Sequence, residues 1–253
     1  MLTALRLVLI RSRQTVSISL RALRRNKMRS ILTALGIIIG VASVVSLVAV
    51  GNGAKVQIQG QVAALGQNLL TIFAGSSRTG GVSSGLGSAS TITLEDAEAI
   101  AREVPDVAAV SPEDTSTAQA IASGRNWSTT VAGESPQYLS IRDWKLASGS
   151  MFTEREVRAA DKVAVIGSKT ALELFGPLDP VGQTVRIKNI PFVIIGLLTS
   201  KGASFGMDQD DRLIIPYSTA MKRLTGDRYL RSVNVEVTGP ERMGAAEEQI
   251  RSL

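Results

Sequence analysis

The chain has 253 residues, which is enough for one large domain or two small ones. It contains no cysteine and no histidine, which excludes disulfides and thiolate chemistry and removes the commonest general base and zinc ligand, so an enzyme is disfavoured. The net charge is +6, but ten of the 28 basic residues precede Glu95, the first acidic residue, and this asymmetry fits a membrane protein better than a nucleic-acid-binding one.

Residues 1–30 form a basic segment in which Leu and Val recur at near-helical spacing. The pattern predicts an amphipathic helix lying along an anionic inner leaflet, with a flexible basic arm as the alternative. The positive flank is densest just before the apolar run, at Arg21, Arg24, Arg25, Lys27 and Arg29.

Residues 31–50 (ILTALGIIIGVASVVSLVAV) contain neither a charge nor a proline. At about 1.5 Å per residue, a helix of this length spans about 30 Å, the hydrocarbon thickness of a bilayer. We therefore predict a transmembrane helix rather than a buried core helix. A cleaved signal peptide is disfavoured, because its apolar region is only about 7–15 residues long and ends at a small-residue cleavage site.

The orientation of this helix follows from the basic residues, most of which precede the span. The positive-inside rule places residues 1–30 in the cytoplasm and residues from about 51 onward outside. The sequence thus predicts a single-pass protein of the cell inner (plasma) membrane with a periplasmic or extracellular C-terminal domain.

Gly36 and Gly40 form a G-x-x-x-G pair within the span. Missing side chains let a second helix approach closely, so we predict a helix-packing site here, although such pairs also occur by chance in glycine-rich spans.

Beyond the span, residues 51–65 are expected to form a polar stalk and residues 75–90 a mobile Gly/Ser linker. Strands are expected at 68–74, 107–110, 119–122, 127–132, 162–166, 184–187, 192–198, 213–215 and 233–237, with a turn at 124–126. Helices are expected at 93–103, with Thr93 as its N-cap, and at 168–175, 218–224 and 240–253. Short strands that alternate with helices indicate an α+β or split βαβ architecture.

Two motifs resemble ligand-binding sequences without matching them. Residues 167–170 (GSKT) resemble the end of a phosphate-binding loop, but a serine separates glycine from lysine and the first glycine is missing. Residues 208–211 (DQDD) lack the later Gly and Glu of a calcium loop, so their carboxylates are expected to cap or orient a loop. Trp127 and Trp144 could anchor a partner, but the low aromatic content favours core packing. The sequence predicts no catalytic residue, no cofactor and no metal site.

Several segments together are similar to a known transport family. The run ALRRNKMRSILTALGIIIGVASVVSLVAVGNGA (22–54) closely resembles the first transmembrane helix of MacB-type ABC exporter permeases. Downstream segments resemble the MacB-like periplasmic core domain: QVAALGQNLLTIFAG (61–75), YLSIRDWKLASGSMFT (138–153), KVAVIGSKTALELFG (162–176), PVGQTVRIKNIPFVIIGLL (180–198) and GMDQDDRLIIPYSTA (206–220). The resemblance covers nearly the whole chain, in order.

The resemblance implies a porter subdomain, residues 66–135 and 230–253, with a sabre subdomain, residues 136–229, inserted into it. It also implies dimerisation, an ABC ATPase subunit as partner and, in Gram-negative relatives, a periplasmic adaptor protein. Full permeases of this type continue into a closing strand and three further transmembrane helices. The end at Leu253 therefore predicts a fragment, a truncated gene or a split permease completed by a complementary chain.

The expected function is that of the N-terminal part of an ABC exporter permease, which couples ATP hydrolysis on a partner to motion of an extracytoplasmic domain. A single-span membrane-anchored adaptor, or a non-functional permease fragment, is the alternative. A surface-anchored hydrolase would need a Ser–Lys or paired-carboxylate site, and the sequence suggests none. The cargo cannot be read from the sequence.

Overall fold

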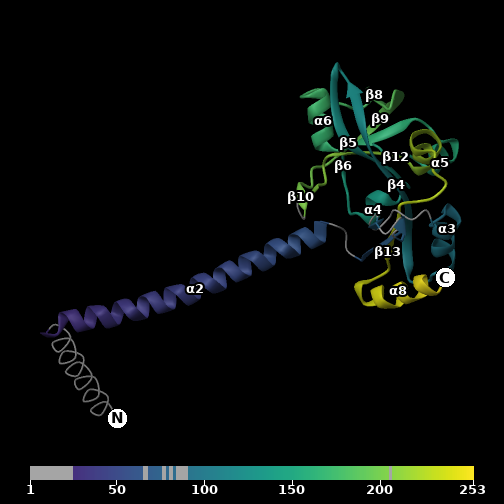
Figure 1. The fold of residues 1–253 in the computed structure, drawn as a ribbon. Coiled ribbons are helices and arrows are strands. Elements are labelled where there is room, and N and C mark those ends of the chain that lie inside the picture. The colour runs from purple at the N-terminus through teal and green to yellow at the C-terminus, as the bar shows by residue number, and fades with distance from the viewer. Residues whose placement is uncertain (1–24, 65–67, 76–77, 80–81, 84–90, 205–206) are drawn as a thin grey trace, which may run out of the picture. The chain divides into compact units, whose positions relative to one another are not determined.

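The computed structural model describes residues 25–64, 68–75, 78–79, 82–83, 91–204 and 207–253 (Figure 1). The chain divides into two compact units, residues 1–59 and 60–253. The amphipathic helix predicted before the span falls largely outside the described residues.

Helix α2 (Lys27–Ala64) is one uninterrupted helix of 38 residues. Its apolar part, Lys27–Val56, is long and apolar enough to cross a membrane, and none of it is buried. The predicted span at residues 31–50 lies inside α2. The predicted stalk is helical as well, because α2 continues through nearly all of it. Within the span, Ser43 donates its hydroxyl to the Ile39 carbonyl at 2.7 Å, so this polar group is satisfied by the helix itself.

The second unit combines short strands and short helices (Figure 1). Its strands are β1 (Leu69–Phe73), β2 (Arg78–Thr79), β3 (Val82–Ser83), β4 (Val107–Ala122), β5 (Arg125–Glu134), β6 (Leu146–Gly149), β7 (Val163–Ile166), β8 (Thr184–Ile187), β9 (Ile190–Leu198), β10 (Ala203–Ser204), β11 (Met207–Asp208), β12 (Arg212–Pro216) and β13 (Ser232–Val237). Its helices are α3 (Leu94–Glu103), α4 (Tyr138–Ile141), α5 (Glu154–Ala159), α6 (Ser168–Phe175), α7 (Tyr217–Thr219), the π-helical turn η1 (Ala220–Thr225), the 3₁₀ turn η2 (Pro240–Arg242) and α8 (Met243–Ser252).

Within the described residues, nine of these strands form one sheet in the order β1-β13-β4-β5-β12-β7-β9-β6, and β8 lies beside β4 and β9. Most neighbours are antiparallel, whereas β5–β12 and β7–β9 are parallel. This mixed arrangement confirms the predicted α+β class with one apolar helix in front of it.

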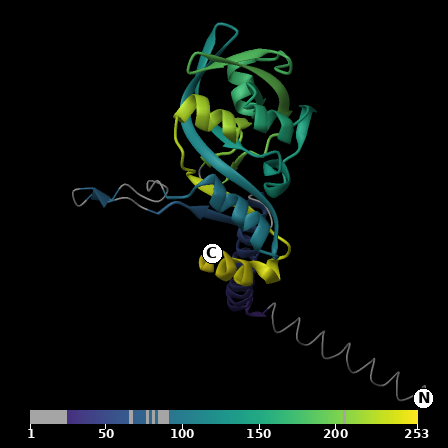
Figure 2. The same ribbon diagram turned by 90° about the vertical axis from the view of Figure 1, so that its right-hand side faces the viewer.

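Strand β4 holds the two halves of the sheet together. Its first half pairs with β13, and its second half pairs with β5 along the whole hairpin. Figure 2 shows this strand curving from one end of the second unit to the other. The hairpin turn lies at Ser123 and Gly124, both with positive φ, and not at the predicted position 124–126, because Arg125 already pairs with Ala122. Two consecutive positive-φ residues make the tight turn that matches strand twist.

Within the described residues, three apolar cores pack against the sheet. Core 1 lies under α6 and η1 and includes Leu174, core 2 lies under α4 and α5 and includes Phe152, and core 3 lies under α3. Alternation along β12 separates the first two, because Leu213 faces core 1 and Ile214 faces core 2. Burying each such side chain contributes about 1.5–3 kcal/mol.

The cores bear on the subdomain boundaries that the resemblance implied. Core 3 joins α3 to β13, which are both in the predicted porter subdomain. The tip of the β4–β5 hairpin, by contrast, contributes Ala120 and Ala122 to core 1 together with residues from 164 to 224. The boundaries at 135 and 229 remain a prediction, and this packing favours grouping the hairpin tip with the sabre subdomain.

Several local expectations change. Within the predicted Gly/Ser linker, β2 pairs with β3, so that part is not an unstructured linker. The predicted helix at residues 218–224 is a short α-helix followed by a π-helical turn. Helix α3 begins as predicted: Thr93 and Asp96 form a reciprocal capping box, which satisfies the first backbone donors of the helix.

Candidate functional site

Helix α2 carries the residues that the sequence singled out for membrane function. In the described structure a Cβ added at Gly36 or Gly40 would meet nothing within 4 Å, so this face is open. Arg25, Lys27 and Arg29 are exposed at the start of the helix. Arg21 and Arg24 lie outside the described residues. The helix-packing role and the cytoplasmic positive flank therefore stay predictions.

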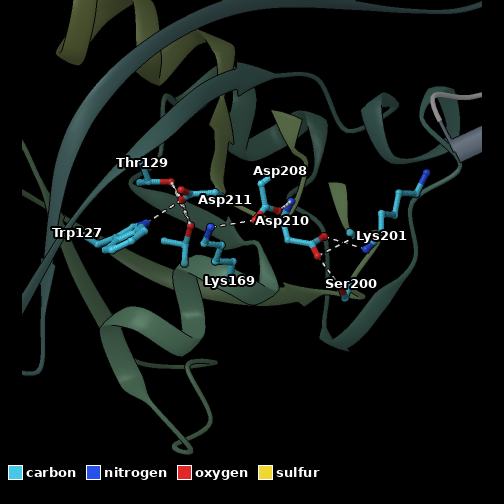
Figure 3. A network of polar contacts seen from close by, with 10 residues as sticks. Trp127, Thr129, Lys169, Ser200, Lys201, Asp208, Asp210 and Asp211 are labelled. Atoms are coloured by element: carbon cyan, nitrogen blue, oxygen red, sulfur yellow. Dashed lines mark hydrogen bonds and ion pairs between the residues drawn. The ribbon is translucent and has the colours of Figure 1, made fainter. Parts of the chain in front are cut away.

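The DQDD segment is bonded to its surroundings through every one of its carboxylates (Figure 3). We name Asp208, Asp210 and Asp211, with the groups that they bind, the acidic joint. The Asp210 carboxylate accepts three hydrogen bonds, from the Lys201 amide at 2.8 Å, from the Gly202 amide at 3.0 Å and from the Ser200 hydroxyl. Asp210 is 5% exposed, so these donors replace the water that it loses.

Asp211 fixes the other side of the joint. One of its oxygens, Oδ1, accepts from the indole N–H of Trp127 at 2.9 Å, the hydroxyl of Thr129 at 2.7 Å and the hydroxyl of Thr170 at 2.9 Å. The two hydroxyls also lie 3.0 Å from each other. One carboxylate therefore links β5, α6 and the start of β12.

The GSKT motif is the partner of this acidic segment. Lys169 forms an ion pair with Asp208 at 2.9 Å, and Thr170 bonds Asp211. A Cβ at Gly167 would lie 2.2 Å from the Asp210 carbonyl oxygen, so this glycine allows the close approach of two backbones. The motif that resembles a phosphate loop is thus half of a structural contact.

The acidic joint connects a strand, a helix and a loop of the second unit through hydrogen bonds. Its carboxylates point to different donors, and no group of three His, Cys, Asp or Glu side chains in the described part of the chain could hold a metal ion. Trp127 and Trp144 are both fixed by their indole N–H groups, the second to the Thr199 carbonyl at 2.8 Å. The hydrogen bonds from the Lys201 and Gly202 amides to Asp210 confirm the predicted role of the 208–211 carboxylates in orienting a loop.

A second set of polar groups lies where the sheet passes from core 3 to cores 1 and 2. We call it the polar layer: Ser111, Glu113, Glu134, Ser135, Ser232 and Asn234. The Ser111 hydroxyl donates to Oε2 of Glu134 at 2.7 Å and accepts from the Ser135 amide at 2.9 Å. Glu113 accepts from the Ser232 hydroxyl at 2.9 Å and from the Asn234 amide at 2.8 Å.

Glu134 is the unusual member of the polar layer. It is 0% exposed, and its Oε1 has no hydrogen-bond partner among the described residues. Burial raises the pKa of Glu134 well above its usual range, and the neighbouring Glu113 carboxylate raises this pKa further. Burial also raises the pKa of Asp114, which accepts a hydrogen bond from Thr225 at 2.7 Å. The sequence reasoning missed this layer, because nothing in the sequence pairs β4 with both β5 and β13.

A comparison with known families and proteins identifies relatives over almost the whole chain. A family model described as the MacB-like periplasmic core domain matches residues 30–253. A macrolide export ATP-binding/permease protein MacB of Syntrophobacter fumaroxidans is 42% identical over 243 residues, covering 95% of this chain and 34% of that protein. The protein of the same name from Azoarcus sp. is 42% identical, covering 93% of this chain and 35% of that protein. The chain spans about a third of the length of these relatives.

Solved structures agree on the fold. The crystal structure of the periplasmic region of MacB from Actinobacillus actinomycetemcomitans matches with a TM-score of 0.64 and 23% identity, covering 76% of this chain and 84% of that one. The extracellular domain of the noncanonic ABC-type transporter YknZ from Gram-positive bacteria matches with a TM-score of 0.59 and 18% identity, covering 72% and 90% respectively.

Proposed function

This chain belongs to the MacB-like periplasmic core domain family, and we propose that it supplies the first membrane span and the extracytoplasmic domain of an ABC-type exporter. In this role the chain itself is not an enzyme, because ATP is hydrolysed on a partner ATPase. The membrane is its other partner, together with a second copy or a complementary permease chain and, in a Gram-negative envelope, an adaptor protein.

One observation carries the proposal: α2 is continuous from the basic flank, through the apolar span, to Ala64, only five residues before β1 begins. An unbroken helix of this length is about 57 Å long. It is a stiff rod, so a displacement at its basic end is carried to the other end rather than absorbed at a hinge. We infer that α2 transmits motion between the ATPase side and the outer domain.

The distribution of charge supports the orientation. Basic residues crowd the start of α2, whereas the first acidic residue is Glu95. We propose that the N-terminus is cytoplasmic, that the second unit lies in the periplasm or outside the cell, and that the protein belongs to the cell inner membrane.

The absence of native cysteine allows a direct test of this topology. Two single-cysteine variants, Ser17→Cys and Leu178→Cys, place one thiol before the span and one in the second unit, where Leu178 is 59% exposed. In intact cells with a permeabilised outer membrane, an impermeant maleimide is expected to label only the Leu178→Cys variant. Labelling of only the Ser17→Cys variant would show the reverse orientation and contradict the proposal.

The rod can be tested in the membrane complex that contains this chain and its ATPase. Val56 and Ile58 are exposed in α2 beyond the predicted span, and Val56→Gly/Ile58→Gly weakens the helix by about 1 kcal/mol per glycine relative to alanine. ATP hydrolysis should continue, while efflux falls at least tenfold. Val56→Ala/Ile58→Ala is the matched control and should keep both activities. Because the relatives are named for macrolide export, a macrolide is the first cargo to measure. Equal efflux by the two variants would refute transmission through α2.

A further inference from the structure

Two adjoining grooves flank α3 in the second unit. The larger, of about 760 Å³, lies between the start of α3, helix α5 and η1, and the smaller, of about 370 Å³, lies between α3 and the start of β4. Leu94 and Tyr217 line both grooves, so the two grooves adjoin at these residues. We call this pair of grooves the α3 seam.

The smaller groove of the seam follows one face of α3. Leu94, Ala97, Glu98 and Ala101 line the smaller groove, and their spacing places them on one side of α3. Two of these residues are alanines, which leave room beside the helix. Ten helical residues span about 15 Å, and an extended chain advances about 3.3 Å per residue. This face of α3 is therefore about as long as four or five residues of an extended peptide.

Charge is distributed unequally along the seam. Arg158, Lys222 and Arg228 line the larger groove, and among the described residues none of the three forms an ion pair or a hydrogen bond through its side chain. Glu98 and Glu154 line the smaller groove. The seam thus has a basic end and an acidic end.

Two acidic side chains also line the basic end, so the attraction there is local. Glu95 and Asp227 both belong to the larger groove and leave it a formal charge of +1. An occupant is therefore selected by the positions of its charges and not by its net charge, since exposed charges beyond about 10 Å are screened by salt.

The floor of the larger groove suits a protein partner. Tyr217 and Tyr229 offer aromatic surface, and Met221 offers an adaptable thioether. Met221 and Lys222 belong to the π-helical turn η1, and Gly226, which follows this turn, has a left-handed conformation. Turns of this kind are rare and are frequently found at functional sites.

We propose that the α3 seam binds an extended segment of a partner protein whose acidic residues lie at the Lys222 end and whose basic residues lie at the Glu98 end. Shape, the order of charges and the aromatic floor all favour a peptide. The proposed interaction uses only residues of the second unit, so its test does not require a measurement of export.

The test uses the full chain in lipid nanodiscs and two fluorescein-labelled octapeptides. One probe carries three glutamates, two leucines and three lysines in that order, and the other has the same composition with alternating charges. Fluorescence anisotropy is expected to give at least tenfold tighter binding for the charge-separated probe. Equal affinity for the two probes, or no binding of either, would overturn the proposal.

A matched pair of variants locates the site. Lys222→Glu/Arg228→Glu reverses the basic end and should weaken binding of the charge-separated probe at least tenfold. Arg155→Glu/Arg223→Glu makes the same change in net charge at two exposed residues that do not line either groove, and should change the affinity less than twofold. If both variants lose binding equally, the attraction is one of net charge and the seam is not the site. Circular dichroism of both variants checks that they fold.

Discussion

The acidic joint and the polar layer place the same chemical group in opposite situations. Asp210 and Asp211 each accept three hydrogen bonds, whereas Glu134 is fully buried with one oxygen bonded and the other unpartnered in the described structure. Both groups are buried, but the three donors around Asp210 replace the water that it loses, whereas Glu134 accepts a hydrogen bond only from Ser111 among the described residues and burial raises its pKa. The polar layer is therefore expected to respond to pH through Glu134.

The largest effect is expected from removing the centre of the joint. Asp211→Ala leaves the Trp127 indole without its acceptor and removes the shared acceptor of two buried threonines, at a cost of about 2–4 kcal/mol. Urea unfolding of the full chain in detergent, followed by tryptophan fluorescence, measures this loss, since both tryptophans lie in the second unit. Glu248→Ala removes an exposed carboxylate from α8 and should have no effect. Equal losses in the two variants would mean that Asp211 does not hold the joint together.

A smaller loss is expected where two backbones approach. In Gly167→Ala the new methyl group would lie 2.2 Å from the Asp210 carbonyl, and overpacking of this kind costs about 1–3 kcal/mol. Gly244→Ala in α8 is the control, because its new methyl group would meet nothing within 4 Å. It should be neutral or slightly stabilising. If Gly167→Ala unfolds at the wild-type urea concentration, the approach of the two backbones is looser than described.

Glu134→Gln should change how the free energy of unfolding depends on pH more than it changes the magnitude of that free energy. Because the pKa of Glu134 is raised in the folded state, its contribution is fully present below the unfolded pKa of about 4.3 and is lost as the pH rises through the folded pKa. The glutamine variant avoids that loss, so unfolding measured from acid to neutral pH should show a shallower decline. The raised pKa of Asp114 leaves some slope in both proteins. Parallel curves would show that Glu134 does not titrate in this range.

The smallest effect is expected at the exposed edge of the joint. The Lys169–Asp208 ion pair lies in solvent, and partners of this kind contribute little because water and salt screen them. Asp208→Asn should therefore unfold close to the wild type, and any difference should vanish at about 1 M salt. A loss as large as that of Asp211→Ala would contradict the ranking of the joint's members.

Local patterns predicted the elements that depend on neighbouring residues. The apolar run identified α2, and residues 168–175 and 184–187 were located without error, because periodicity and the flanking glycine and proline are local signals. Helix α5 was missed because its six residues are too short for a periodic pattern.

Contacts across the sheet could not be predicted in the same way. In the sequence, residues 167–170 and 208–211 stand out as two incomplete ligand motifs, and nothing indicates that they are the two halves of one joint. Their contact depends on α6 lying against the start of β12, which no spacing in the sequence reveals. The burial of Glu134 could not be predicted from the sequence, because it results from the register of β4 with its neighbours β5 and β13.

The position of β13 between β1 and β4 has a consequence for biosynthesis. Thr71 on β1 and Asn234 on β13 are hydrogen-bonded across a separation of 163 residues. Strand β1 leaves the ribosome long before β13 and has to wait for it, and pairings of such high contact order form slowly. During that interval β1 exposes its backbone, so a nascent chain stalled before residue 232 should be a preferred client of chaperones and proteases.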